Sequence, residues 1–180
     1  AKHRCTGPEQ EGNNDCGRRQ EGIQRGKDEL GQGGGTRHRV NTGDKFSESG
    51  NRFLDIEEVA GAGERLKQPA GNVEDGESLA AAAARETLEE AAWRVNPTAL
   101  VGVYQWQSPR NGTYVRFTFA AEPRVHEPTR PLDAGIVRAL WLTYDEIVAR
   151  RQMHRSPLVL RSLADYRAGL PWPPGLISSL

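Results

Sequence analysis

The stretch that decides the fold is PAGNVEDGESLAAAAARETLEEAAW, residues 69–93. Its alanines, and the run RETLEE that follows them, are nearly all good helix formers, so the stretch predicts a helix over 78–91. Helical residues advance by about 100° each, which brings Glu86, Glu89 and Glu90 within an arc of about 100°. Three carboxylates are therefore expected on one face of this helix.

These carboxylates would repel one another near the negative end of the helix dipole, where only Arg85 offsets them. A divalent cation would relieve the repulsion, and an oxygen-only ligand set suits Mg²⁺, or Mn²⁺ in its place. The plain alternative is a charged helix face in solvent. Such a face usually alternates Glu with Lys, but this helix contains no Lys. Gly71 and Gly76 give the preceding loop the freedom to bring backbone groups near a metal.

The flanking sequence predicts strands interleaved with a few helices, which indicates an α/β or α+β domain. Apolar runs and alternation predict strands over 40–46, 52–57, 100–107, 113–121 and 136–142. The first of these is expected to be interrupted by Gly43 and Asp44. Residues 61–63 are expected to form a loop. Asn111 and Gly112 are a strong hairpin signal between two strands.

Two further helices are expected in the last third of the chain. Thr143 and Glu146 form the pattern of a capping box, which predicts the start of a short helix. Ser156 is expected to cap the last helix, with Pro157 at its first position and Gly169 at its end.

The first 38 residues are rich in Gly, Gln, Arg, Glu and Asn, and such a segment buries too little apolar surface to offset its ordering entropy. We therefore expect a disordered or irregular arm over 1–38, a folded domain over 39–170 and an irregular tail over 171–180. Cys5 and Cys16 lie in the arm and are expected to be free thiols, with a disulfide or a metal site as alternatives.

The chain has 24 acidic and 24 basic residues, which gives a formal net charge of zero. This balance gives no reason to expect a long nucleic acid or an anionic membrane as a partner. No stretch has the roughly 18–20 apolar residues that cross a bilayer, and no apolar secretory signal opens the sequence. The absence of a signal favours the cytoplasm, and we expect a monomer or homodimer that acts on a small molecule.

The spacing of the motif resembles the Nudix box, G-x5-E-x7-R-E-U-x-E-E-x-G-U, in which U is aliphatic. Six fixed positions match it in register: Gly71, Glu77, Arg85, Glu86, Glu89 and Glu90. Three positions differ from it, namely Thr87, Ala92 and Trp93, and none of them removes a carboxylate. Ala92 stands in place of a glycine, and an alanine there is strained by about 1 kcal/mol if the helix must end with a positive φ.

Further segments resemble the NudJ-type phosphatase subgroup of this family, over about residues 50–170. They are Gln68–Gly71, Tyr104–Trp106, Arg116–Phe117, Trp141 and Arg155–Val159. The resemblance implies an α/β Nudix fold, with a mixed β-sheet between α-helices. It also implies Mg²⁺-dependent hydrolysis of a diphosphate linkage in a nucleoside di- or triphosphate, or in a pyrimidine diphosphate that is a precursor of thiamine.

The resemblance assigns metal-binding and catalytic roles to residues of the box. Glu89 and Glu90 would be the main metal ligands, with the Gly71 carbonyl as another. Glu86 would complete the metal site or take a proton from the attacking water. Arg85 would orient a neighbouring carboxylate.

Three residues outside the box are candidates for binding substrate. Trp106 and Tyr104 are placed to stack on a base or pyrimidine ring, with core packing as an equal alternative. Arg116 alternates with apolar residues and is a candidate phosphate contact, with a surface or ion-pair role as its alternative.

Two other functions stay open. Residues 40–45 are polar where similar proteins carry a hydrophobic first strand, and Asp55 lies in the next expected strand. Both features weaken the expected sheet and favour a catalytically silent Nudix domain that acts as a nucleotide-binding module, whereas the complete set of carboxylates favours an enzyme. An RNA-end pyrophosphohydrolase is the third option, and the neutral charge counts against it.

Overall fold

The computed structural model describes residues 37–44, 52–61, 63–109, 112–169, 171–173 and 176–177, and for the first of these ranges it describes the backbone alone. The expectations for the N-terminal arm up to residue 36, including both cysteines, lie outside the described residues. Regular structure begins at Arg37, two residues before the expected start of the domain.

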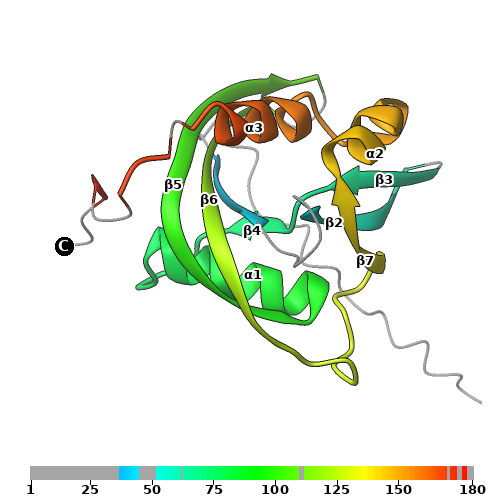
Figure 1. Cartoon of the computed structure of the whole chain (residues 1–180), viewed down its shortest axis with the longest axis horizontal. Helices are drawn as coiled ribbons and strands as arrows, with labels where there is room; N and C mark the ends of the chain where they lie inside the picture. The colour runs from blue at the N-terminus through cyan, green and yellow to red at the C-terminus, as the bar shows by residue number, and fades with distance from the viewer. Residues whose placement is uncertain are drawn as a thin grey trace, which may run out of the picture. The chain divides into compact units, whose positions relative to one another are not determined.

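The larger sheet has four strands in the order β4-β1-β6-β5 (Figure 1). They are β1 (Arg37–Asp44), β4 (Ala70–Asn72), β5 (Trp93–Ser108) and β6 (Gly112–His126). β1 runs parallel to β6 and the other neighbours are antiparallel, so the sheet is mixed. The expected interruption of the first strand is wrong, because Gly43 and Asp44 continue the ladder opposite Ala120 and Ala121.

The hairpin expected at Asn111 and Gly112 is confirmed by the antiparallel pairing of β5 with β6. Ser108 pairs with Gly112, whose φ of 76° is favourable for glycine and for few other residues. Both strands are longer than expected. β5 begins directly after the motif helix and continues through Pro97, where the register of the pair shifts.

The smaller sheet has three antiparallel strands in the order β3-β2-β7. They are β2 (Arg52–Ala60), β3 (Gly63–Lys67) and β7 (Ile136–Thr143). The sequence predicts a loop over 61–63, but Gly63 already pairs with Ala60 across a tight turn at Gly61. β3 was therefore missed, and it brings the residues just before the motif into the sheet.

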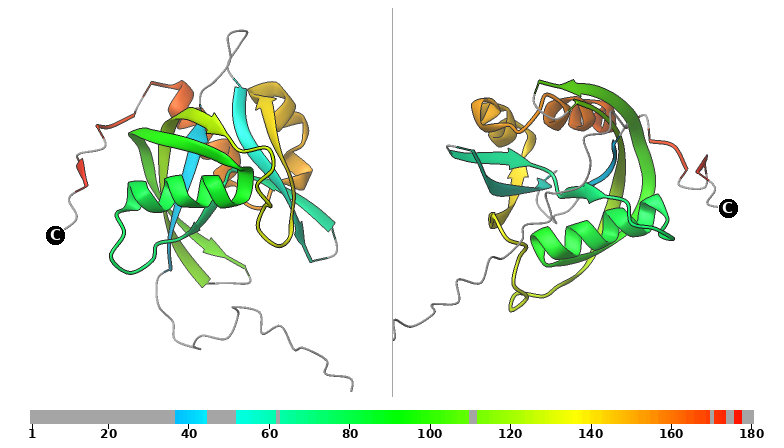
Figure 2. Two further views of the ribbon diagram at one scale, coloured as in Figure 1. Left: turned by 90° about the horizontal axis from the view of Figure 1, so that it is seen from below. Right: turned by 180° about the vertical axis from the view of Figure 1, so that it is seen from behind.

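Helices cover both sides of the sheets, as Figures 1 and 2 show from opposite directions. They are α1 (Leu79–Ala91), α2 (Tyr144–Ala149), the 3₁₀ turn η1 (Arg151–Met153) and α3 (Leu158–Arg167). α1 lies on one side and α2 and α3 on the other. The fold is thus the expected α/β arrangement with strands between helices, although the strands form two sheets rather than one.

One of the two expected helix caps is confirmed, and Ser78 provides a cap that was not predicted. Ser78 caps α1 by accepting a hydrogen bond from the first turn, and Thr143 and Glu146 form the complete capping box of α2. The cap expected at Ser156 is wrong, because Pro157 occupies that position without a side-chain bond. The buried Ser156 hydroxyl has no hydrogen-bond partner among the described residues.

Three buried apolar clusters join the helices to the sheets. The first lies between the smaller sheet and the helices α2 and α3, the second between α1 and the β5–β6 pair, and the third between the end of α1 and the smaller sheet. Their buried members are Phe53, Leu66, Leu142, Ile147, Val159 and Leu163; Ala82, Ala83, Leu100 and Phe119; and Leu54, Ile56 and Ala91. The small alanine side chains let α1 pack closely on the strands, which fixes the direction of its acidic face.

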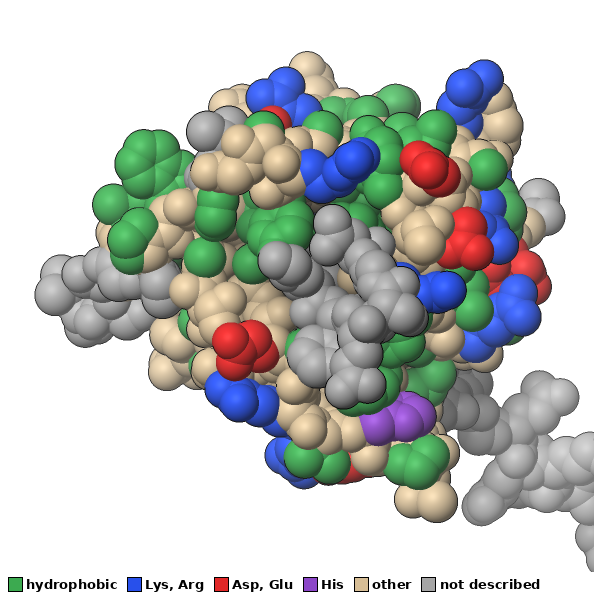
Figure 3. All heavy atoms as spheres, in the orientation of Figure 1, with side chains coloured by type: hydrophobic (Ala, Val, Ile, Leu, Met, Phe, Trp, Pro, Cys, Tyr) green, Lys and Arg blue, Asp and Glu red, His purple; other side chains and the backbone are tan. Residues whose placement is uncertain are grey.

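On the face shown in Figure 3, acidic and basic side chains are interspersed. This mixture agrees with the net charge of zero. In the part of the chain that the structure describes, no helix has the length and apolar character needed to cross a lipid bilayer.

Candidate active site

Glu77 and Arg85 hold the loop before α1 against the helix. The Glu77 carboxylate accepts a hydrogen bond from the Glu74 backbone N–H at 2.7 Å and two from Arg85, at 3.1 Å from Nε and 2.6 Å from Nη2. Arg85 Nη2 also donates to the Asn72 carbonyl at 2.9 Å. The hydrogen bond from Arg85 is the main reason that the pKa of Glu77 is lowered. Arg85 therefore connects the loop, the end of β4 and the helix.

Two of the three predicted carboxylates converge on one cationic nitrogen. Arg85 Nη1 donates to Glu86 Oε1 at 2.8 Å and to Glu89 Oε2 at 3.0 Å. Arg85 thus contacts neighbouring carboxylates as predicted, and its hydrogen bond with Glu77 is the largest cause of its raised pKa. The two glutamates present oxygens to a shared positive charge at the surface of α1.

Gly71 lies directly against the Glu86 side chain. A Cβ atom at this position would collide with the Glu86 carboxylate, so a larger residue here would force the end of the Glu86 side chain to move. Burial raises the pKa of Glu86, Arg85 opposes the rise, and the nearby charges of Glu90 and Glu89 add to it. The loop before α1 and the helix therefore bring the backbone at Gly71 and the Glu86 carboxylate together.

The third carboxylate, Glu90, points to a different cation. Lys67 Nζ at the end of β3 donates to both Glu90 oxygens, at 2.8 and 3.0 Å, and the Ala70 backbone N–H donates to Oε2 at 2.8 Å. Burial raises the pKa of Glu90, and the charge of Lys67 opposes this rise. Lys67 had no predicted role, because it lies among other charged and polar residues before the motif, namely Glu64, Arg65 and Gln68.

The predicted metal ligands are thus divided between two cationic side chains. Among the described residues, no three His, Cys, Asp or Glu side chains form a group that could hold a metal ion. Glu86 and Glu89 nevertheless fit Mg²⁺, which takes one or two protein carboxylates, keeps several waters and bridges to substrate phosphates. Glu90 fits it less well, because both of its oxygens bind Lys67.

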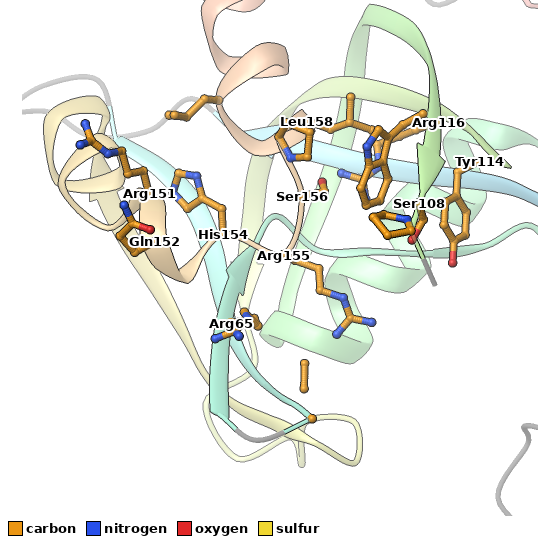
Figure 4. A pocket seen from close by; sticks show the side chains of 16 residues that line it. Arg65, Ser108, Tyr114, Arg116, Arg151, Gln152, His154, Arg155, Ser156 and Leu158 are labelled. Carbon is orange, nitrogen blue, oxygen red and sulfur yellow. The ribbon is translucent and has the colours of Figure 1, made fainter. Parts of the chain in front are cut away.

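A pocket of about 800 Å³ opens between β3, the β5–β6 pair and the segment that precedes α3 (Figure 4). Trp106 and Arg116 line it, and Trp106 stacks on Tyr114 with ring centroids 6.0 Å apart. Figure 4 shows Tyr114 and Arg116 on one side of the pocket and Arg151 on the other. The pocket therefore combines aromatic rings with several guanidinium groups.

Tyr104 does not line this pocket. Its hydroxyl donates to Asp165 Oδ2 of α3 at 3.0 Å, and burial followed by this contact raises the pKa of the phenol. The structure therefore gives Tyr104 a contact between β5 and α3, in line with the packing alternative. Tyr104 pairs with Arg116 across the β5–β6 ladder but, unlike Arg116 and Trp106, does not line the pocket.

A chain of ionic contacts joins the pocket to the acidic helix. Arg155, which lines the pocket, donates to Glu58 Oε1 at 2.8 Å. Glu58 Oε2 lies 3.7 Å from Lys67 Nζ, which binds Glu90 as described above. Glu58 had no predicted role, and only the pairing of β2 with β3 brings it next to Lys67.

Comparison with known proteins identifies the family of this chain. The model of the NUDIX domain matches residues 46–162. Phosphatase NudJ of Escherichia coli (strain K12) is 36% identical over 122 residues, which make up 68% of this chain and 79% of that phosphatase. A NUDIX hydrolase from Nitrosomonas europaea superposes with a TM-score of 0.77 at 39% identity, covering 81% of this chain and 98% of that one.

More distant solved structures share the fold. The MutT protein from Methanosarcina mazei Go1 has a TM-score of 0.57 at 17% identity, covering 75% of this chain and 96% of that one. Nudix hydrolases generally use divalent metal ions, usually Mg²⁺, and act on small diphosphate compounds. The chain therefore belongs to the Nudix hydrolase family, as a Nudix-type pyrophosphohydrolase related to NudJ.

Proposed function

We propose that this enzyme uses Mg²⁺ to hydrolyse a diphosphate linkage in a nucleoside di- or triphosphate, or in a pyrimidine diphosphate that is a precursor of thiamine. The observation that carries the proposal is the convergence of Glu86 and Glu89 on one cationic nitrogen, 2.8 and 3.0 Å away. A divalent cation in that position would meet the same two oxygens. The relationship to phosphatase NudJ supports hydrolysis of a phosphate compound.

In this proposal Glu86 and Glu89 are the direct ligands of the metal, with the Gly71 carbonyl beside them. Glu90, which the sequence predicts as a main ligand, is occupied by Lys67. A bound Mg²⁺ would neutralise phosphate charge and lower the pKa of a water ligand. Arg85 keeps Glu86 and Glu89 close together before the metal binds, and it keeps its contacts with Glu77 afterwards. Gly71 leaves room for the Glu86 carboxylate beside the backbone of β4.

The pocket supplies the recognition of the substrate. Trp106, already stacked on Tyr114, offers a ring face to a base or pyrimidine. Arg116 and the neighbouring Arg65 and Arg155 offer guanidinium groups to phosphate oxygens, for which planar donors are well suited. Tyr104 acts indirectly, because its hydroxyl holds α3 against β5.

The test is to measure phosphate release from a panel of nucleotides and the pyrimidine diphosphate, with and without Mg²⁺. Loss of a group that only supports a metal ligand costs 10- to 100-fold in activity, so Glu89→Gln should lower kcat/KM by at least about 100-fold. The matched control is Glu64→Gln on β3, because Glu64 is an exposed carboxylate outside the pocket and the acidic helix.

Two results would contradict the proposal. One is phosphate release by the wild type that does not depend on the metal. The other is phosphate release by the wild type that is no greater than release by Glu89→Gln. Tight nucleotide binding without turnover would instead support the silent binding module.

A further inference from the structure

Lys67 is a buried lysine at the end of β3. Its side chain is 5% exposed and that of Glu90 is 10% exposed. The ammonium nitrogen lies 2.8 and 3.0 Å from the two Glu90 oxygens, 3.1 Å from the Ala70 carbonyl oxygen and 3.7 Å from Glu58 Oε2. Four oxygens from three residues therefore surround one cationic nitrogen.

The groups around Lys67 are of the kind that bind divalent cations in proteins. Two carboxylates and a backbone carbonyl form an oxygen-only set, as in Mg²⁺ and Ca²⁺ sites. Two buried carboxylates side by side are unfavourable without a positive charge between them. Lys67 supplies this charge from within the chain, and its place in the sheet, opposite Ile56 of β2, directs it to the α1 side.

The contrast with Arg85 shows which of the two cations can be exchanged. The Arg85 side chain is 24% exposed and that of Glu89 is 31% exposed, so dissolved ions have access to this pair. If Arg85 Nη1 moves away from Glu86 and Glu89, the same guanidinium keeps its hydrogen bonds to Glu77 and Asn72. Lys67 has a single donor atom, and moving it would leave the buried Glu90 carboxylate without a cation, whereas the partly exposed Glu58 would keep its contact with Arg155.

We propose that the Lys67 ammonium takes the place of a divalent cation at Glu90 and Glu58, so that metal ions bind this chain through Glu86 and Glu89 alone. The inference rests on the proposed function in assuming a metal on α1, but it concerns the number of bound ions and not turnover. Lys67 is thus a positioning residue that sets the metal content of the site.

The test counts the Mn²⁺ ions bound per chain, from the electron paramagnetic resonance of free Mn²⁺ during a titration. Lys67→Asn removes the ammonium, adds an oxygen ligand and leaves Glu90, Glu58 and the Ala70 carbonyl in place. We expect this variant to bind one more Mn²⁺ than the wild type. We also expect Mn²⁺ to raise its melting temperature more, because the additional ion binds only the folded state.

Two variants serve as controls for this count. Lys67→Arg keeps a positive charge and should bind as many ions as the wild type. Lys67→Asn/Glu90→Gln removes the lysine together with its main partner and should also gain none. Circular dichroism establishes that each variant is folded. If Lys67→Asn does not fold without metal, Lys67→Asn/Glu58→Gln leaves a single uncompensated carboxylate and is used for the same count.

Equal Mn²⁺ counts in the wild type and in the folded Lys67→Asn variants would overturn the proposal. A gain that persists in Lys67→Asn/Glu90→Gln would overturn it as well, because the additional ion would then not depend on Glu90. Phosphate release is a separate measurement. A wild type that binds Mn²⁺ but hydrolyses none of the panel contradicts the proposed function, while the ion count still decides the role of Lys67.

Discussion

Two buried carboxylic acids, Glu90 and Asp55, lie on opposite sides of the smaller sheet, and only Glu90 has hydrogen-bond partners there in the part of the chain that the structure describes. On the α1 side, Glu90 accepts hydrogen bonds from Lys67 and from the Ala70 backbone. Asp55 lies two residues after Phe53 in β2, so both side chains point to the same face of the sheet, toward the apolar cluster under α2 and α3. Neither carboxylate oxygen of Asp55 has a hydrogen-bond partner among the described residues. Burial raises the pKa of Asp55 to about 8. Burial raises the pKa of both groups, but among the groups that the structure describes a charged partner opposes the rise only at Glu90.

Replacing Asp55 gives the largest expected change in stability. Asp55→Val keeps a similar size, suits a strand and removes the carboxyl from the apolar cluster. The pKa of Asp55 is about 8 in the folded chain, against an ordinary value of 3.8. At pH 7 the carboxyl therefore ionises only when the chain unfolds, which favours the unfolded state. We expect Asp55→Val to raise the free energy of unfolding by about 4 kcal/mol in urea titrations at pH 7. An unchanged or lower value would show that Asp55 has a compensating partner.

Removing the charge of Glu90 should have the opposite sign. Glu90→Gln leaves the buried Lys67 ammonium without its main counter-ion, and breaking a buried pair in this way is strongly destabilising. We expect a loss of about 3 kcal/mol in the metal-free protein. Combining Glu90→Gln with Lys67→Met should recover part of this loss. A Glu90→Gln variant as stable as the wild type would remove the contrast with Asp55.

The pH dependence of stability sharpens the same contrast. In the unfolded chain Asp55 loses its proton near pH 3.8, whereas in the folded chain it keeps the proton to about pH 8. Stability is therefore lost as pH rises between these values, and the loss attributable to Asp55 from pH 5 to pH 7 should be about 2.5 kcal/mol. Asp55→Asn does not titrate, so the difference between its unfolding curve and that of the wild type isolates this effect. Parallel curves would contradict it.

A smaller effect on stability is expected at the end of α1, the helix that carries Glu90, because Ala92 there has an unfavourable backbone conformation. Ala92 has a φ of 57°, the left-handed conformation that the Nudix spacing predicts for a glycine. Ala92→Gly should raise the free energy of unfolding by about 1 kcal/mol, measured by thermal unfolding. Ala91→Gly is the matched control, because Ala91 is helical and buried, and glycine there should destabilise.

Local patterns in the sequence were sufficient for the elements that short-range forces determine. The alanine-rich run predicted α1, Thr143 and Glu146 predicted the capping box, and Asn111 with Gly112 predicted the hairpin. Pairing between distant segments was not visible in the same way. The polar β1 is a full strand because β4 and β6 pair with it on either side, whatever its own propensity.

The same division applies to the candidate site. Helical spacing predicted that Glu86, Glu89 and Glu90 share one face, and two of them, Glu86 and Glu89, contact Arg85. The partner of Glu90 was missed, because Lys67 reaches it only through the pairing of β3 with β2. The assignment of Tyr104 to substrate stays a prediction without a place in the pocket, since strand alternation could not distinguish a pocket residue from one under α3.

The parallel pairing of β1 with β6 also constrains how the chain folds. The residues of β1 are synthesised before all the other strands, but their parallel partners are Tyr114–Ala121, far along the chain. Contacts between distant segments form slowly, because a large loop must close first. The β5–β6 hairpin and α1 need only near neighbours and can form early. We therefore expect β1 to join the sheet last. Its polar composition weakens it as an isolated strand, and it also disfavours pairing with other chains before β1 has joined the sheet.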